Sequence, residues 1–247
     1  MADYFNVKIE FDHQILLNLI RQTIEDGTKG YVCVIDANVL TMAQNNTSYR
    51  KVLCDALVNT CDGSSIALMA SHIYKKKFEA LNGPKIFSTF IESNYKHLLL
   101  GSTIQTLDRI RIKVASKGFQ SNHIYTLPLP FNSIDYFDYE SIAEQINKVN
   151  PDIIWVSLGA PKQEVFMSKI LPYINRGVMF GIGAAFNFYI GDLNISTFSF
   201  GGLRFIWLGR LFHEPKKLIK RLIPYILIMP RLYLEERRKN NSMLNLN

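Results

Sequence analysis

Short apolar runs recur along residues 1–195, and segments with helical spacing separate them. Continuous runs of this kind are typical of strands that are buried on both faces of a sheet. The clearest is Asp152-Ile-Ile-Trp-Val-Ser-Leu158, which is followed by a turn. Strands that alternate with helices of about 10 to 15 residues form βαβ units. The sequence therefore predicts an α/β fold with a mostly parallel sheet flanked by helices.

The predicted elements place several loops at one edge of this sheet. Further strands are expected at 31–35, 65–69, 97–101, 123–127 and 177–182, and helices at 47–57, 106–117 and 141–148. Parallel sheets bind their ligands at the carboxyl ends of the strands. Candidate site residues are therefore expected in the loops after Ile35, Leu100, Leu158 and Ile182.

The formal net charge of +7 is concentrated in the C-terminal part of the chain. Residues 1–195 carry 18 basic and 18 acidic side chains, whereas residues 196–247 carry 10 basic and 3 acidic ones. Such an asymmetry favours a neutral domain with a basic appendage that meets an anionic partner. We therefore predict two parts, 1–195 and 196–247.

The tail has the composition of a segment that lies on a membrane surface. Its apolar stretch, Leu222 to Pro230, is much shorter than the roughly 20 residues of a spanning helix. Basic residues flank this stretch, and three aromatic residues suit an interface: Trp207, Tyr225 and Tyr233. Three prolines are expected to end or kink helices: Pro215, Pro224 and Pro230. The alternative is a helical pair that packs on the domain with a solvated basic face.

Composition and spacing exclude several classes of protein. A hydrophobic fraction of 48% excludes a disordered chain. The three cysteines form no CxxC pair and the five histidines show no ligand spacing, so neither a disulfide scaffold nor a metal site is expected. The N-terminus does not resemble a signal peptide, which predicts a cytoplasmic location. No nucleic-acid-binding motif accompanies the basic tail, so nucleic acid is not an expected partner.

Two glycine-containing motifs follow predicted strands. Gly159-Ala-Pro-Lys-Gln-Glu164 begins a helix, whose free N–H groups suit a phosphate or a sugar hydroxyl; the alternative is an ordinary turn. Gly181-Ile-Gly-Ala-Ala-Phe186 resembles a dinucleotide fingerprint, but Phe186 replaces the third glycine and the ribose-binding acid is missing. These departures argue against an NAD(P)-dependent oxidoreductase. A close approach of the Gly183 backbone to another ligand still fits.

Two polar segments carry candidate site residues. Asp62-Gly63 lies between a predicted helix and a predicted strand, where an aspartate is a turn residue or, at the rim of a site, a general base. Asp36-Ala-Asn38 follows the strand at 31–35. Its side chains suit ligand hydrogen bonds, but they also suit the cap of a helix. Both alternatives stay open on spacing alone.

Taken in order, these motifs and two in the tail resemble one family. The set comprises Asp62-Gly63, Leu158–Glu164, Gly181–Phe188 with Gly191, Trp207-Leu-Gly-Arg-Leu211, and Glu214-Pro215 with Arg221. It is similar to the WecG/TagA/CpsF glycosyltransferases of bacterial surface-polymer synthesis, from about Tyr31 to Tyr225. The resemblance implies a Rossmann-like catalytic domain and a C-terminal appendage that binds the membrane and closes the active site.

The resemblance also implies a reaction and its partners. It is an inverting, metal-independent transfer from a UDP-sugar, without a cofactor, to a polyprenyl-diphosphate-linked saccharide at the cytoplasmic face of the membrane. The product would serve capsule, teichoic acid or exopolysaccharide synthesis. The donor stays open among N-acetylmannosamine, its uronic acid, glucose and glucuronic acid. Two alternatives remain: a catalytically silent partner of an assembly complex, and packing of the apolar tail on a second copy of the chain.

The family's roles carry over residue by residue. Asp62 would deprotonate the acceptor hydroxyl, because a hydroxyl is a poor nucleophile at neutral pH. Arg210 would stabilise the diphosphate leaving group. Gln163 would hold the sugars, Gly183 would approach the nucleotide, and Asn187, where the family usually has Asp, would bond the uracil edge. The other candidate substrate-binding residues are Asp36, Asn38, Gly63, Gly101 and Lys162.

Some positions depart from the family's pattern. Asp36-Ala-Asn38 stands where the family commonly has Thr-x-Asn, so either residue could take the asparagine role. Ile206 replaces a glutamate, Ile195-Ser-Thr197 replaces Arg-Ala-Pro, and Gly83-Pro-Lys85 stands near the usual Gly-x-Asp. These changes leave the predicted class of reaction in place and leave the donor sugar open.

Overall fold

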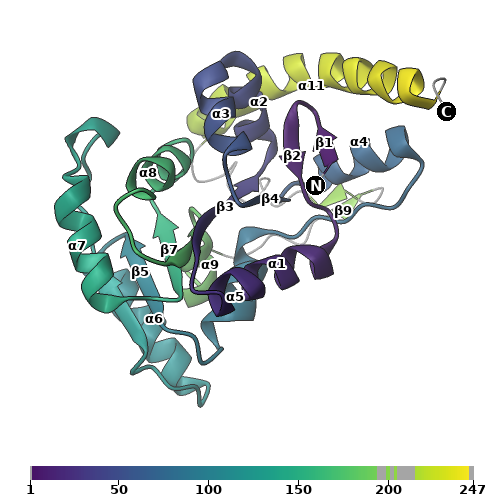
Figure 1. Ribbon diagram of the computed structural model, residues 1–247. Coiled ribbons are helices and arrows are strands. Elements are labelled where there is room, and N and C mark those ends of the chain that lie inside the picture. Colours follow the sequence, from purple (N-terminus) through teal and green to yellow (C-terminus); the bar gives the residue numbers. More distant parts are fainter. Residues whose placement is uncertain (1, 194–198, 201–202, 205–214, 245–247) are drawn as a thin grey trace.

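The computed structural model describes residues 2–193, 199–200, 203–204 and 215–244, and it describes side chains for 3–193 and 223–242. At its centre is a parallel six-stranded sheet in the order β4-β3-β8-β7-β5-β6 (Figure 1). The strands are β3 (Lys29–Ile35), β4 (Val58–Cys61), β5 (His97–Gly101), β6 (Ile124–Leu127), β7 (Ile153–Ser157) and β8 (Gly177–Gly181). The predicted α/β fold is confirmed.

Helices cover both faces of the sheet, and each face has its own apolar core. On one face lie α2 (Ala37–Asn45), α3 (Thr47–Cys54), α4 (Ser64–Tyr74), α7 (Tyr139–Val149) and α8 (Lys162–Ile170). On the other lie α1 (His13–Glu25), α5 (Gly83–Ile91), α6 (Ile104–Ser116) and α9 (Ala185–Ile190). Successive side chains of a strand point to opposite faces, so Val32 enters one core and Cys33 the other.

Several short elements lie outside the main sheet and its covering helices. Two antiparallel pairs lie outside the main sheet: β1 (Ala2–Tyr4) with β2 (Val7–Ile9), and β9 (Ser199–Phe200) with β10 (Leu203–Arg204). A 3-10 turn, η1 (Ile134–Tyr136), precedes α7. The predicted boundary between residues 195 and 196 lies outside the described residues.

The strand predicted at 65–69 is wrong, because those residues belong to α4 and the strand of this region is β4. β4 carries two polar residues, which hides it from an apolar pattern. Both are buried and bonded: the Asn59 Nδ2 donates to the Leu53 carbonyl at 2.7 Å, and the Thr60 hydroxyl donates to the Leu81 carbonyl at 3.1 Å. Asp62 therefore directly follows a strand, at the carboxyl edge of the sheet.

In the part of the tail that the structure describes from residue 215 on, the chain forms one long helix, α11 (Pro215–Leu244). The predicted alternative of a helical pair also involves residues outside the described ranges, so it stays a prediction. Helix α11 begins at Pro215 and continues through Pro224 and Pro230, so of the two expected effects, an end or a kink, neither of these prolines ends the helix. Each proline removes one helical N–H donor. Packing compensates, because Met229 and Leu232 are buried in the core on the face of α2 and α4. Of the described helices, none is long and apolar enough to span a membrane.

A buried polar contact fixes α11 on α4. The Tyr74 hydroxyl donates to Glu236 Oε1 at 2.5 Å, and Glu236 is only 2% exposed. Near it, the Asn240 Nδ2 donates to the Ile73 carbonyl at 3.2 Å. Burial and the neighbouring carboxyl group raise the pKa of Tyr74, so the phenol stays a proton donor at all ordinary pH values.

We expect Tyr74→Phe to lower the free energy of unfolding by about 1–3 kcal/mol, because it leaves a buried carboxyl group without its donor. Denaturant titration measures this difference. Tyr136→Phe is the matched control, since Tyr136 is 79% exposed. Equal losses in the two variants would contradict the prediction.

Candidate functional site

The carboxyl ends of the central strands bring the predicted loops together at one edge of the sheet. β3 and β8 are neighbours, yet the helices that follow them, α2 and α9, lie on opposite faces. A parallel sheet leaves a crevice for ligands where neighbouring connections diverge in this way. The loops after β4 and β7 flank that point. The candidate site therefore lies at this edge.

Asp62 lies at this edge, beside the end of β3. Ile35 pairs with Cys61 in register, so the next residues, Asp36 and Asp62, leave the sheet side by side. The Asp62 backbone N–H donates to the Ile35 carbonyl at 2.9 Å. Its Oδ1 accepts from the backbone N–H of Gly83, the first residue of α5, at 3.1 Å. These contacts hold a half-buried carboxylate at the rim, the position that a general base needs.

Asp36 caps α2. Its Oδ1 accepts from the Val39 backbone N–H at 2.7 Å, so one carboxylate oxygen has the structural role that the sequence left open. Asn38 follows in the first turn of α2 and is half-buried. Among the described residues, no side chain or backbone group hydrogen-bonds the Asn38 amide. Which of Asp36 and Asn38 takes the family's asparagine role stays open.

Gln163 joins the loops after β7 and β8 from inside the protein. Its side chain is 4% exposed, and its Oε1 accepts from the backbone N–H groups of Gly159 at 3.1 Å and Gly183 at 2.9 Å. The Gly183 carbonyl accepts in turn from the Ser157 hydroxyl at 2.7 Å. Both backbone groups of Gly183 are thus engaged. The approach of Gly183 to a nucleotide and the direct contact of Gln163 with a sugar both stay predictions.

The glycine pattern after β8 serves this arrangement. A Cβ on Gly181 would lie 2.8 Å from Met167 Cε and 3.1 Å from Gln163 Nε2, so a larger residue here would require both side chains to shift. Gly183 has φ +51°, which a glycine adopts without strain. The resemblance of Gly181-Ile-Gly183 to a dinucleotide fingerprint therefore has a local packing explanation.

Glu164 lies behind Gln163 and is fully buried. Its Oε1 accepts from Gln163 Nε2 at 2.8 Å, and its Oε2 accepts from the Tyr49 hydroxyl at 3.1 Å. Burial raises the pKa of Glu164 to about 7, against the hydrogen bonds that favour the ionised form. Sequence reasoning did not identify Tyr49 as a site residue, because its position in α3 fits the apolar periodicity of a core residue.

The remaining predicted residues lie around this centre. The Lys162 ammonium donates to the Asn132 carbonyl and lies 4.9 Å from the centroid of the Phe137 ring, so it is turned toward the loop after β6. Asn187 is half-buried in α9. Gly63 precedes α4, and Gly101 ends β5 with φ +86°. Arg210 and Trp207 lie outside the described residues.

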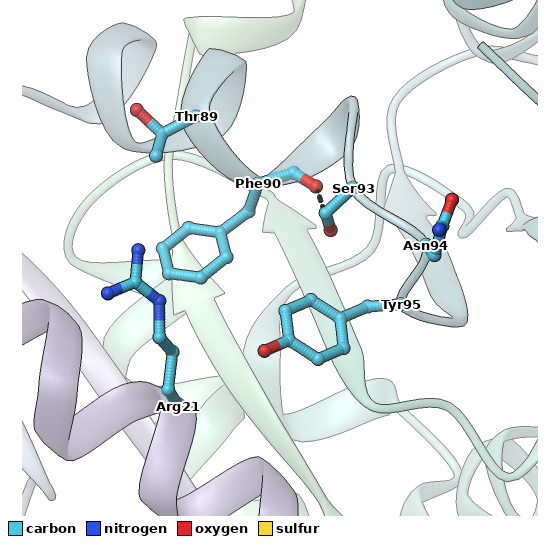
Figure 2. A pocket seen from close by; sticks show the side chains of 6 residues that line it. All are labelled: Arg21, Thr89, Phe90, Ser93, Asn94 and Tyr95. Atoms are coloured by element: carbon cyan, nitrogen blue, oxygen red, sulfur yellow. Dashed lines mark hydrogen bonds between the residues drawn. The ribbon is translucent and has the colours of Figure 1, made fainter.

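The described residues contain no group of three or more His, Cys, Asp or Glu side chains that could hold a metal ion. A hollow of about 390 Å³ lies between α1 and the segment before β5 (Figure 2). Its lining is Arg21, Thr89, Phe90, Ser93, Asn94 and Tyr95. This hollow is at the amino end of β5, away from the residues that carry the chemistry.

Comparison with known proteins gives one consistent picture. The model of the glycosyl transferase WecG/TagA/CpsF family matches residues 2–242. An N-acetylglucosaminyldiphosphoundecaprenol N-acetyl-β-D-mannosaminyltransferase of Bacillus spizizenii strain W23 is 23% identical over 207 residues, which is 80% of this chain and 77% of the relative. A protein of the same name from Staphylococcus aureus strain MW2 is 21% identical over 224 residues, 85% and 84% of the two chains.

The raised pKa of Glu164 predicts a pH-dependent difference in stability between the protein and Glu164→Gln. The folded state holds the Glu164 proton up to about pH 7, whereas the unfolded state releases it near 4.5. This contribution to the free energy of unfolding is therefore complete below about pH 4.5 and is lost as the pH rises through about 7. Urea unfolding measures this free energy for both proteins. Between about pH 4.5 and pH 7, the unaltered protein should lose at most about 3 kcal/mol relative to Glu164→Gln. A difference that does not change with pH would contradict the prediction.

Proposed function

The chain belongs to the WecG/TagA/CpsF family of glycosyltransferases, and we propose that it transfers an N-acetylmannosaminyl group from a UDP-sugar to a polyprenyl-diphosphate-linked N-acetylglucosamine. The names of the relatives from Bacillus spizizenii and Staphylococcus aureus support this donor group and this acceptor. The product serves the synthesis of a bacterial surface polymer. The observation that carries the proposal is the placement of Asp62 at the carboxyl edge of the sheet.

Asp62 is the proposed general base. The acceptor hydroxyl oxygen attacks the anomeric carbon while the bond from that carbon to the diphosphate oxygen breaks. Asp62 takes the hydroxyl proton, and UDP leaves with the bonding electron pair. A single displacement inverts the anomeric configuration, which agrees with the β-linked product in the relatives' names when the donor is α-linked. The Gly83 N–H orients the carboxylate for this task.

Some of the other candidate residues are proposed to bind the UDP-sugar, and some to bind the acceptor. Asn187 suits the uracil edge, since an amide both donates and accepts hydrogen bonds. Asn38 and Gly63 lie on the Asp62 side of the edge, where the acceptor enters. We propose that Arg210 stabilises the charge that develops on the diphosphate, so that departure of UDP needs no metal. The resemblance of Trp207-Leu-Gly-Arg-Leu211 to the family's tail motif supports this role.

We propose that the exposed side of α11 contacts the membrane and that the protein acts at the cytoplasmic face. Its apolar side chains recur on one side of the helix and are half or more exposed: Ile223, Ile226, Leu227 and Leu234. Arg237 and Arg238 are exposed on the same helix. Apolar side chains next to basic ones suit a bilayer that contains anionic lipid.

We expect Asp62→Asn to lower kcat roughly 10²–10⁴-fold, because the amide keeps the contact with Gly83 but accepts no proton. The assay is transfer from UDP-N-acetylmannosamine to a short-chain polyprenyl-diphosphate N-acetylglucosamine. Asp135→Asn is the control, since Asp135 is exposed and pairs only with Lys169 among the described residues. Retention of kcat within a few-fold in Asp62→Asn would exclude Asp62 as the base.

Replacement of Ile226 and Leu227 by serine should weaken binding to vesicles that contain anionic lipid by roughly tenfold or more, because two apolar side chains no longer leave water. Sedimentation with vesicles measures the affinity. The double replacement of Ile104 and Ile112 by serine is the matched control, since both are exposed isoleucines of α6. If both double variants bind as the unaltered protein does, α11 is not the membrane contact.

A further inference from the structure

The orientation of the Gln163 amide decides whether the loops after β7 and β8 are joined. Two N–H donors, from Gly159 and Gly183, converge on one end of this amide. Only the carbonyl oxygen can accept both, and the reversed amide would set its own N–H groups against them. The correct orientation therefore needs an acceptor at the Nε2 end.

Glu164 supplies that acceptor, and Tyr49 holds Glu164. The contacts run from Gln163 Nε2 to Glu164 Oε1 at 2.8 Å and from the Tyr49 hydroxyl to Glu164 Oε2 at 3.1 Å. The other titratable groups whose charges act on this carboxyl group are Cys33 in β3 and Asp36 at the start of α2. Neither is a cation, so the arrangement is not an ion pair.

The arrangement works in both protonation states of Glu164. When the carboxyl group is ionised, both oxygens accept. When it is neutral, its carbonyl oxygen accepts from Gln163 Nε2 while its hydroxyl donates to the Tyr49 oxygen. The Gln163 amide therefore keeps its orientation on either side of the Glu164 titration.

Stability alone does not explain a carboxyl group at this position. Removing a carboxyl group from water has a free-energy cost, and a well-packed apolar side chain of similar volume is often neutral or stabilising by comparison. The same helix already buries apolar side chains, since Phe166 and Met167 are fully buried. What the carboxyl group adds is a directed acceptor for Gln163.

We propose that Glu164 and Tyr49 are positioning residues for glycosyl transfer, acting through the Gln163 amide to hold Gly159 and Gly183 in place. The inference rests on the proposed function, because these two loops border the crevice that receives the donor. Misplacement of the reacting groups by about 1 Å can lower a rate about 10²-fold. The positioning pair therefore affects kcat without touching either substrate.

The experiment compares Glu164→Leu with Glu164→Gln in the full chain. Leucine removes the acceptor, and we expect kcat to fall roughly 10- to 100-fold with a smaller change in KM. Glutamine keeps an oxygen for Gln163 Nε2 and an N–H for the Tyr49 oxygen, so it should restore kcat to within about threefold. Ile170→Ala controls for loss of packing, because Ile170 is fully buried in the same helix.

Amide hydrogen exchange at Gly159 and Gly183 gives a second readout that needs no substrate. Exchange at both should accelerate in Glu164→Leu and remain slow in Glu164→Gln. If Glu164→Leu does not fold, Tyr49→Phe replaces it, with kcat expected to fall roughly threefold to tenfold and exchange at Gly183 to accelerate.

The two readouts separate failure of this inference from failure of the proposed function. An unaltered protein without transferase activity would reject the proposed function, while the exchange rates still test the positioning pair. An active protein whose kcat and exchange rates are the same in Glu164→Leu would overturn the inference. An equal loss of kcat in Ile170→Ala would also overturn it, because the effect would then be general destabilisation.

Discussion

One amide oxygen, Gln163 Oε1, binds the ends of two neighbouring strands by accepting from the N–H groups that follow β7 and β8. Several features of the sequence depend on this contact. A Cβ on Gly181 would crowd Gln163, and the N–H of Gly183, whose φ is +51°, donates to the same amide. Glu164 is buried next to its hydrogen-bond donor. The motifs after β7 and β8 are thus two halves of one structural unit.

The sequence predicts most of the sheet and only part of the site. Apolar runs identify β3, β5, β7 and β8, because central parallel strands are buried on both faces. β4 escapes the same reasoning, since Asn59 and Thr60 are polar residues buried in the sheet, where the Asn59 Nδ2 and the Thr60 hydroxyl donate to backbone carbonyls outside β4. Without β4, the position of Asp62 at the sheet edge could not be derived. The contact of Tyr49 with Glu164 joins residues 115 apart, a pairing that no local pattern contains.

The tail differs from the domain in net charge, but its helix α11 is attached to the domain by apolar packing. Net charge separates residues 196–247 from a neutral domain, yet α11 is held by the domain through an apolar face and a buried glutamate. Pro224 and Pro230 remain inside the helix because that face is packed on α2 and α4. The proposed anionic partner of the tail rests on its charge, whereas apolar side chains determine how α11 is attached to the domain.

Helix α4 begins next to the candidate site and ends in contact with α11. Asp62 lies just before its first turn, and Tyr74, its last residue, bonds Glu236 of α11. The 11 residues between them form a rod about 16 Å long. In the proposed arrangement, with α11 on a lipid surface, α4 would connect that surface to the proposed base. An acceptor tethered to the same surface would then be selected by the length of its head group as well as by contacts with its sugar.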